Sequence, residues 1–406
     1  MLEINGKYTK AKVYADIVDD KTLEQVQTLV DQAFMKGVKV AIMPDCHAGK
    51  GCVIGTTMTI KDKIVPNLVG VDIGCGMLLV KLGKINIDYK ALDKFIKKNI
   101  PYGQRVNEDI IVPTSIKLED FYCYKDLKNL TYLKKSVGSL GNGNHFIEID
   151  VDKDDNKYLI IHSGSRNLGK QVAEIYQNIA VQYHKDKVFN INLEKEKIIH
   201  TYKAMNNQKN IQKELDKLKK LSVEPNIPEE LCYLEGKDFD HYMHDMNLCQ
   251  IFATDNRYEM ARRIVKFLGY SLRDLEHFET IHNYINMNDK ILRKGAISAY
   301  KGEIVLIPIN MKDGCIIARG KSNKSYNYSA PHGAGRIMSR NQAFKELNVE
   351  DYKEAMKGIF STTINKNTLD EAPFCYKDIN SILDNIKDTV DVLEIIKPVY
   401  NFKADN

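Results

Sequence analysis

Short apolar runs that lead into glycine-rich loops recur along this chain of 406 residues, and several of the loops carry a histidine next to the run. Glycine permits the tight turns and close backbone approaches that such loops need. The segments lie at 43–51, 139–150, 158–169, 280–285 and 330–336. Because they are spread over most of the chain and no low-complexity linker separates them, a site built from these loops must draw on the whole chain. This pattern predicts one composite domain over 1–406.

The remaining segments have the periodicity of helices as well as strands. Residues 22–36 place apolar side chains at three- and four-residue intervals, which predicts an amphipathic helix, and 38–43 is predicted to be a strand ending at Pro44. A long helix is predicted over 239–268. Polar residues interrupt its otherwise apolar and aromatic face: Asp245, Gln250, Asn256 and Arg257.

A lysine-rich segment of helical period and low glycine content lies at 192–222. It predicts a helical insertion within the domain, at 190–238. Two interpretations fit its charge, a solvated helix face and a surface that follows nucleic-acid phosphates, and we expect the first. The lysines concerned are Lys195, Lys197, Lys203, Lys209, Lys213, Lys217, Lys219 and Lys220.

Composition excludes several classes of protein. A hydrophobic fraction of 43% and a charged fraction of 28% are those of a folded chain, not a disordered one. No run approaches the roughly 18 to 20 apolar residues that span a bilayer, and the first residues mix charged and apolar types, so a cytoplasmic protein is expected. The 8 cysteines form no CxxC pair, which argues against a disulfide scaffold or a zinc ribbon. The net charge of +5 is too small to identify a nucleic-acid binder.

Asp72 and Cys75 stand three residues apart in the loop Gly-Val-Asp-Ile-Gly-Cys-Gly at 70–76. The glycines remove side-chain bulk, so a carboxylate oxygen and a thiolate could reach the same metal ion. Taken alone, the motif is better explained by a tight turn that carries a buried cysteine. The histidines elsewhere in the chain favour the metal.

His145, His162 and His282 each stand at the end of a short apolar run beside a loop. One such histidine is usually a hydrogen-bonded core residue, but several together with Asp72 and Cys75 point to metal ligands. Five potential ligands exceed the four of one tetrahedral ion. The sequence therefore predicts two metal ions, manganese or zinc, that share the thiolate, an arrangement common in phosphoryl chemistry.

His332 opens the segment His-Gly-Ala-Gly-Arg at 332–336, which precedes a helix predicted over 337–347. Glycines leading into a helix N-terminus would offer backbone N–H groups to an anion, and Arg336 would add donors for a phosphate. A histidine at this position can bind phosphate, act as acid or base, or act as a nucleophile. The alternative is a turn at the helix entry with a capping role.

Taken in order, these motifs resemble those of the RtcB family of RNA ligases, from about residue 40 to the C-terminal segment. The motifs are MPDCHAGKG, GVDIGCGM, GNGNHFIE, HSGSRNLG, IHN, RKGA and HGAGR. The resemblance implies an α+β fold with a deep central site that holds two Mn²⁺ ions. It also implies GTP as the nucleotide and a reaction that joins RNA ends bearing a 3′-phosphate or 2′,3′-cyclic phosphate to a 5′-hydroxyl.

The resemblance also assigns roles to residues. It makes Cys75 the thiolate that bridges both metals, and His332 the nucleophile that takes GMP from GTP and hands it to the RNA 3′-phosphate. The other metal ligands would be Asp72, His145, His162 and His282. Nucleotide contacts would come from Asn144, Glu148, Asn283, His332, Gly333, Ala334, Gly335 and Lys403. Phosphate or RNA contacts would come from Arg166, Lys294 and Arg336.

The expected partners are RNA with broken ends and an archease-like activator protein, with the chain itself a monomer. The chain departs from the family pattern at 306–314, where a Gly-Ser-Met-Gly turn is usual, and at 321–331, before His332. These departures suggest a divergent branch, serving either tRNA splicing or the repair of cleaved RNA.

Two other classes of function compete with RNA ligation. A binuclear metallohydrolase would use the same ligands, with metal-bound hydroxide as nucleophile and His332 as an acid, and would form no GMP adduct. A non-catalytic RNA-binding module has no use for a cluster of cysteine, aspartate and histidines. The metal ligands therefore favour an enzyme.

Overall fold

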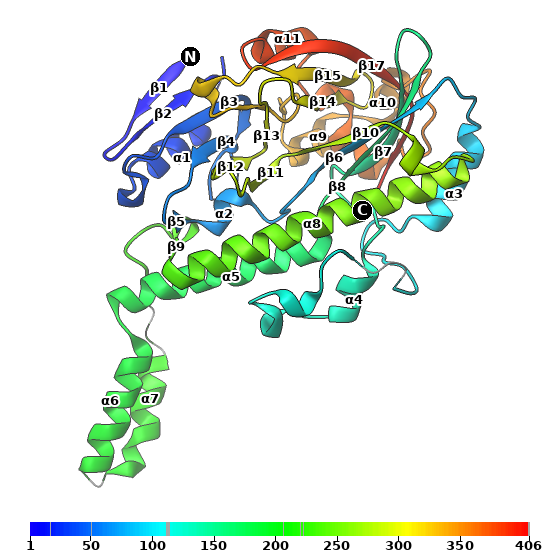
Figure 1. Ribbon diagram of the computed structural model, residues 1–406. Helices are drawn as coiled ribbons and strands as arrows, with labels where there is room; N and C mark the ends of the chain where they lie inside the picture. Colours follow the sequence, from blue (N-terminus) through cyan, green and yellow to red (C-terminus); the bar gives the residue numbers. More distant parts are fainter. Residues whose placement is uncertain are drawn as a thin grey trace.

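Two large sheets form the body of the protein, and long helices cross beneath them (Figure 1). The computed structural model describes residues 1–404 except 17, 50, 111–113, 206, 220 and 222. Strands and helices occur in both halves of the chain, as expected for an α+β protein. None of the described helices combines the length and the apolar character that crossing a membrane would require.

The first sheet joins the N-terminal strands to two strands from the middle of the chain. Neighbouring strands are antiparallel except for β2 and β3. Its order is β1 (Leu2–Asn5), β2 (Lys10–Val13), β3 (Val40–His47), β4 (Ile54–Thr59), β12 (Ile291–Lys294) and β11 (Asn283–Ile285). The parallel crossover from β2 to β3 runs through α1 (Asp20–Val30), whose first turn is capped by the carboxylate of Asp19.

The second sheet is antiparallel throughout and curls until its edge strands meet. Its order is β10 (His277–Ile281), β6 (Gly76–Gly83), β8 (Lys157–Ser163), β7 (Phe146–Val151), β17 (Val390–Lys403), β15 (Gly314–Gly320) and β14 (Ile304–Asn310). The edge strands β10 and β14 touch, and the backbone N–H of Leu306 donates to Thr280 Oγ1 at 3.0 Å. The sheet is therefore close to a closed barrel, and an apolar cluster that includes Phe146, Ile160 and Cys315 lies against one of its faces.

Short strand pairs and helices complete the fold. The pairs are β13 (Ala296–Ser298) with β16 (Ser329–Pro331) and β5 (Lys63–Ile64) with β9 (Leu234–Glu235). The helices besides α1 are α2 (Pro66–Val69), α3 (Tyr89–Asn99), α4 (Leu130–Lys135), α5 (Arg166–Val188), α6 (Ile191–Ala204), α7 (Ile211–Lys219), α8 (Gly236–Phe267), α9 (Arg340–Glu346), α10 (Val349–Ala355) and α11 (Ile379–Ile386).

Helix α8 connects the two largest hydrophobic cores. Its N-terminal half buries residues such as Tyr242 and Met246 among the side chains of α2 and α5, whereas its C-terminal half buries Ile264 and Val265 against the curled sheet. The helix predicted over 239–268 is thus confirmed, with a start three residues earlier. Because α8 reaches both cores, it can position loops that come from either sheet.

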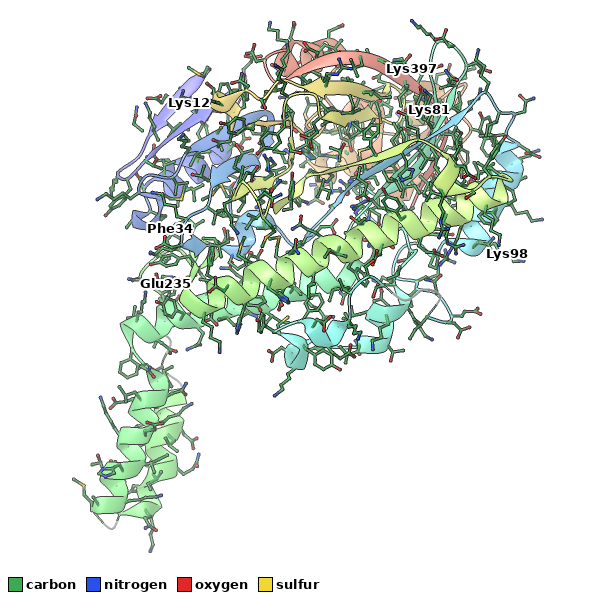
Figure 2. The ribbon with its side chains drawn as sticks, viewed as in Figure 1. Lys12, Phe34, Lys81, Lys98, Glu235 and Lys397 are labelled. Atoms are coloured by element: carbon green, nitrogen blue, oxygen red, sulfur yellow. The ribbon has the colours of Figure 1, made fainter. Side chains whose placement is uncertain are left out.

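Helices α6 and α7 form a hairpin that projects away from the body (Figure 1). Figure 2 shows their side chains surrounding the pair, and no residue of α6 is buried. At the base of the hairpin, the Glu235 carboxylate forms ion pairs with Lys187 Nζ at 2.9 Å and with Lys63 Nζ at 3.4 Å. The helices predicted at 192–222 are present, while Lys220 and the side chain of Lys219 lie outside what the structure describes.

Two predicted boundaries were wrong. Strand β3 runs through Pro44 to His47, because the register between β3 and β4 shifts between Ile42 and His47 and proline's missing N–H falls in that irregular stretch. Helix α1 ends at Val30 instead of residue 36, and a separate short 3-10 turn follows over Ala33–Met35.

Candidate metal and nucleotide site

A cavity of about 430 Å³ is lined by residues from both large sheets. Strands β4 and β12 contribute from the first sheet, and β7, β8, β14, β15 and β17 contribute from the second. The segment 332–336 and the loop before β6 also line it. The glycine loops that are spread along the sequence therefore converge here, as the composite-domain prediction requires.

The loop at 70–76 places Asp72 and Cys75 at this cavity. Gly74 has φ +72°, and a Cβ there would lie 2.9 Å from the Cα of Gln250 in α8, so only glycine allows the loop to pack against this helix. Gly164 likewise leaves space for the Asp72 carboxylate, since a Cβ there would clash with Asp72 Oδ1. Glycines on two separate loops thus make room for the acid.

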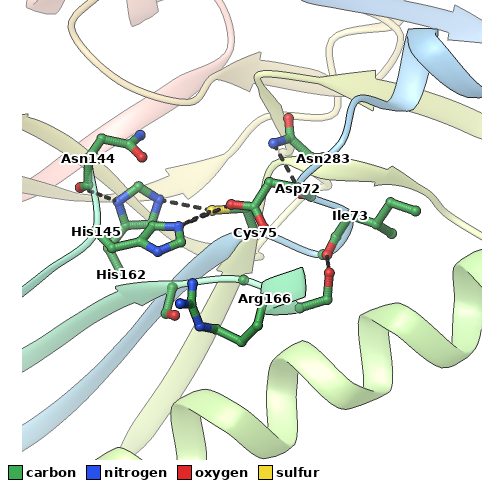
Figure 3. A network of polar contacts seen from close by, with 12 residues as sticks. Asp72, Ile73, Cys75, Asn144, His145, His162, Arg166 and Asn283 are labelled. Carbon is green, nitrogen blue, oxygen red and sulfur yellow. Dashed lines mark hydrogen bonds and ion pairs between the residues drawn. The ribbon is translucent and has the colours of Figure 1, made fainter. Parts of the chain in front are cut away.

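The predicted metal ligands lie together in two groups that share Cys75. Figure 3 shows four of them, Asp72, Cys75, His145 and His162. One group is Asp72, Cys75 and His145, and the other is Cys75, His162 and His282. Cys75 Sγ lies 3.4 Å from His145 Nε2 and 3.3 Å from His162 Nε2. Each group could therefore hold a metal ion, and Cys75 belongs to both groups.

The protonation of the histidines supports a cation in this cluster. His145 Nδ1 lies 2.9 Å from the carbonyl oxygen of Leu140, and His162 Nδ1 lies 3.2 Å from that of Asn144. A carbonyl only accepts hydrogen bonds, so each Nδ1 carries the proton, and in a neutral ring Nε2 carries a lone pair. That lone pair of His145 faces Asp72 Oδ2 at 3.0 Å, and that of His162 faces Nε2 of His282 at 3.4 Å. A metal ion placed between these atoms could be bound by the lone pairs of the neutral rings.

The pKa shifts follow from burial and neighbouring charge. Burial, followed by neighbouring histidines, lowers the pKa of His162 and His282 well below the usual range, so both are neutral ligands at pH 7. Burial and then the charge of Asp72 raise the pKa of the Cys75 thiol in the metal-free protein. Burial would raise the pKa of Asp72 as well, but when a proton occupies His145 Nε2 in place of a metal ion, contact with that ring lowers the pKa of the carboxyl to about 2.

His332 stands beside the cluster, directly after β16, and its ring centroid lies 5.0 Å from that of His282. Its Nδ1 donates to Oδ2 of the buried Asp45 at 2.7 Å, and its backbone N–H donates to the same oxygen at 3.2 Å. This contact places the ring proton on Nδ1 and leaves the Nε2 lone pair available to an electrophile. A Cβ at Gly295 would lie 3.3 Å from His332 Cε1, so the RKGA segment leaves space for the ring.

The helix predicted to begin at 337 was wrong. Helix α9 begins at Arg340, capped by Ser339, so Gly333, Ala334 and Gly335 form a loop and do not offer a helix N-terminus. Gly335 has φ +74°, and a Cβ there would lie 3.1 Å from the backbone of Asp45. The glycine therefore brings the loop against the residue that holds His332.

The predicted nucleotide contacts line the same cavity. Asn144, Glu148, Asn283 and the loop 333–335 are all part of its wall. Lys403 is also there, with Nζ 2.6 Å from Glu371 Oε2, a carboxylate that sequence reasoning did not single out.

The three predicted phosphate contacts differ in position. Lys294 and Arg336 line the cavity; Lys294 Nζ donates to the carbonyl oxygens of Cys52 and Asn67 at 3.0 Å. Arg336 donates to the carbonyl oxygen of Met338 at 3.1 Å. Arg166 is not part of the cavity wall, and its Nε donates to Ser139 Oγ at 3.2 Å beneath the loop of His145.

Two polar residues of α8 form hydrogen bonds with the backbone of the loops that carry the candidate metal ligands. Arg257 is fully buried, and its Nη1 donates to the carbonyl oxygens of Gly74 and Ser163 at 2.8 Å. Asn256 Oδ1 accepts from the backbone N–H groups of Gly138 and Ser139 at 2.8 and 3.0 Å. Of the polar residues that interrupt the apolar face of this helix, Asn256 and Arg257 therefore support the site.

We expect Arg257→Leu to lower the free energy of unfolding by about 3–5 kcal/mol, because it leaves the buried carbonyls and Glu279 without their cation. Chemical denaturation checks this. Arg262→Leu on the same helix is the control, since its side chain is 50% exposed and pairs with Glu259, and it should cost about 1 kcal/mol or less. Equal losses in the two variants would show that Arg257 has no special supporting role.

Comparisons with known proteins identify the family of this chain. A family model described as tRNA-splicing ligase RtcB matches residues 25–126 and 125–404. The RNA-splicing ligase RtcB of Escherichia coli strain K12 is 30% identical over 416 residues, covering 93% of each chain. The tRNA-splicing ligase RtcB of Methanococcus maripaludis is 27% identical, covering 87% of this chain and 85% of that protein. With the family model spanning nearly the whole sequence, the chain belongs to the RtcB family.

Proposed function

We propose that this protein is a GTP-dependent RNA ligase that joins a 3′-phosphate or 2′,3′-cyclic phosphate end to a 5′-hydroxyl end. The observation that carries the proposal is the juxtaposition of two ligand groups sharing Cys75 with His332, whose Nδ1 is bound by Asp45. Family membership and the RNA-splicing ligases among the relatives support the choice of RNA as substrate.

In the first step, His332 Nε2 attacks the α-phosphorus of GTP. A P–N bond forms, the bond from the α-phosphorus to the bridging oxygen breaks, and pyrophosphate leaves. The Asp45 carboxylate accepts a hydrogen bond from the Nδ1–H group and stabilises the positive charge that the ring acquires. Two Mn²⁺ ions held by Asp72, Cys75, His145, His162 and His282 would withdraw charge from phosphoryl oxygens when bound.

In the later steps, an oxygen of the RNA 3′-phosphate displaces His332 from the guanylate phosphorus, which leaves the RNA end as a diphosphate to guanosine. The 5′-hydroxyl then attacks the RNA phosphorus, its proton passes to solvent, and GMP leaves as the strand is sealed. A cyclic end is first opened by water to the 3′-phosphate. Lys294 and Arg336, which line the cavity, would contact phosphate oxygens.

One pair of measurements tests the proposal. Incubation with GTP and Mn²⁺ should add the mass of one GMP to the protein, and ATP should add nothing. A gel should then show joining of a 3′-phosphate RNA to a 5′-hydroxyl RNA with GTP. Cleavage of RNA without any GMP adduct would instead identify a binuclear hydrolase.

The hairpin of α6 and α7 allows a separate prediction about RNA binding. Several of its lysines pair with glutamates of their own helix, such as Lys197 with Glu194 and Lys217 with Glu214. We therefore expect that changing Lys197 and Lys217 to Gln leaves the salt dependence of RNA affinity unchanged, because lysines held by glutamates of their own helix contact no phosphate and release no counterions. Titration of RNA at several salt concentrations measures this, and a flatter slope in the variant would place the hairpin on RNA.

A further inference from the structure

Two acidic residues, Glu148 and Asp150, lie side by side on one face of β7. Residues two apart on a strand point to the same face. Glu148 pairs with Asn401 of β17, and Asp150 pairs with Pro398 of the same strand. Their exposed fractions are 2% and 0%. Glu148 lines the nucleotide cavity, whereas Asp150 lies behind it and is not part of the cavity wall.

The hydrogen bonding of this pair is incomplete unless one acid is protonated. Glu148 Oε2 accepts from Asn401 Nδ2 at 2.5 Å. Both carboxyl oxygens of Asp150 are buried and receive no hydrogen bond. Oxygen atoms of Glu148 and Asp150 and the sulfur of Cys315 all lie within 4.8 Å of one another. A buried carboxylate without donors is costly, but a protonated Asp150 can donate to Glu148.

The neighbouring strands do not supply enough positive charge to ionise both acids. On β8, Tyr158 stands opposite Asp150, but its hydroxyl donates to Asp152 at 2.9 Å. On β17, Lys403 Nζ pairs with Glu371, and Lys397 is about half exposed, with Nζ 3.9 Å from Asp313. On β15 the nearby group is the thiol of Cys315.

The pKa shifts of the two acids agree with this shortage of nearby positive charge. Burial raises the pKa of both acids, and the charge of Glu148 raises that of Asp150 further. Lys403 and the Asn401 amide favour the ionised form of Glu148. When Glu148 is ionised, the pair therefore still holds one proton, with Asp150 as its carrier.

We propose that Asp150 is a positioning residue for nucleobase recognition, because its protonated carboxyl donates to Glu148 and fixes the Glu148 carboxylate toward the cavity. Held between Asp150 and Asn401, that carboxylate matches a base edge with two adjacent N–H donors, as guanine has. Adenine would present a ring-nitrogen acceptor to it and be repelled. The inference rests on the proposed function, in which Glu148 contacts the base, and extends it to a residue outside the cavity wall.

Calorimetric titration with GMP and AMP tests this role without the covalent step. Asp150→Leu removes the donor at similar size and should weaken GMP binding about tenfold, the effect of one lost hydrogen bond to a charged group, with AMP binding unchanged. Asp150→Asn keeps a donor and should stay within about threefold of the wild type. Asp152→Asn, an acid of the same segment outside the cavity wall, is the control.

The pH profile provides a second readout. In the wild type, raising the pH removes the proton from Asp150, so GMP affinity should fall on the alkaline side. Asp150→Asn has no such proton and should lose that part of the decline, an effect that a purely structural role would not produce. This comparison is decisive even if Asp150→Leu does not fold.

Several outcomes would overturn the inference. They are unchanged GMP affinity in folded Asp150→Leu, an equal loss for AMP, an equal loss in Asp150→Asn, or identical pH profiles for Asp150→Asn and the wild type. Failure of the proposed function has a different signature. A wild type that forms no GMP adduct, yet binds GMP through Asp150 as described, would refute ligation and leave this role of Asp150 intact.

Discussion

Cys75→Ala should deprive the protein of both metal ions and reduce guanylylation and ligation by more than about 100-fold. The reason is that Cys75 belongs to both ligand groups, with Asp72 and His145 on one side and His162 and His282 on the other. Loss of a residue that merely orients a ligand already costs about 10- to 100-fold in metal affinity or activity, so loss of a shared ligand should cost more. Metal content after dialysis against Mn²⁺ and the mass of the GMP adduct measure the effect.

Cys249→Ala is the matched control for this variant. Cys249 is also a fully buried thiol, on α8, but it belongs to no ligand group among the described residues. Its replacement removes a similar volume from the interior and should leave both metal content and the GMP adduct close to normal. Near-normal metal content in Cys75→Ala would show that the two groups do not share a bridging sulfur.

The fold was predictable where local pattern determines structure. The apolar periodicity at 239–268 predicts α8, and the helical period of the lysine-rich segment at 192–222 predicts α6 and α7. The curling of the second sheet was not predictable, because it depends on the meeting of β10 and β14 at its edges. Nor does local propensity place Pro44 inside β3, since tertiary pairing with an irregular register is what admits it.

The candidate metal ligands could be predicted to lie together because their types and loop settings are unusual, whereas the acids that bind His332 and Lys403 have ordinary settings. Asp45 stands 287 residues before His332, within β3, and nothing local in the sequence distinguishes its carboxylate from that of any other acid. Glu371 is similarly remote from Lys403, to which it is bound. Asp150 is hidden for another reason, since an acid inside a strand is expected to face solvent. Only the pairing of β7 with β8 and β17 shows that it faces inward.

The roles of the polar residues Asn256 and Arg257 of α8 could be predicted only in part. Asn256 and Arg257 stand out in the sequence because they interrupt an apolar face, but the sequence does not tell what they bind. In the structure they hold the backbone of the loops that carry Cys75, His145 and His162. Interruptions of a long buried helix are therefore useful signals of a supported site, even when the partners are unknown.

His332→Ala should retain the metals, form no GMP adduct and fail to join a 3′-phosphate end. It should nevertheless seal RNA that already carries the 3′-diphosphate guanosine end. His332 belongs to neither ligand group, so its removal leaves the sulfur, imidazole and carboxylate donors in place. Its proposed work is confined to loading and handing over GMP, whereas the attack of the 5′-hydroxyl needs only the metals and the phosphate contacts. Metal content, adduct mass and gels with both RNA ends measure these expectations.

The His332→Ala variant separates the loading of GMP from the sealing of the strand, and His277→Ala is its control. His277 is on β10, outside the cavity wall, with Nδ1 bound to the carbonyl oxygen of Leu275 at 2.8 Å, so its loss should affect neither step. A GMP adduct that persists in His332→Ala would assign the nucleophile to another residue. If the variant retains its metals but fails to seal the preactivated end, His332 also serves the last step. Its Nε2 lone pair, which is left free by the contact of Nδ1 with Asp45, would then receive the proton of the 5′-hydroxyl.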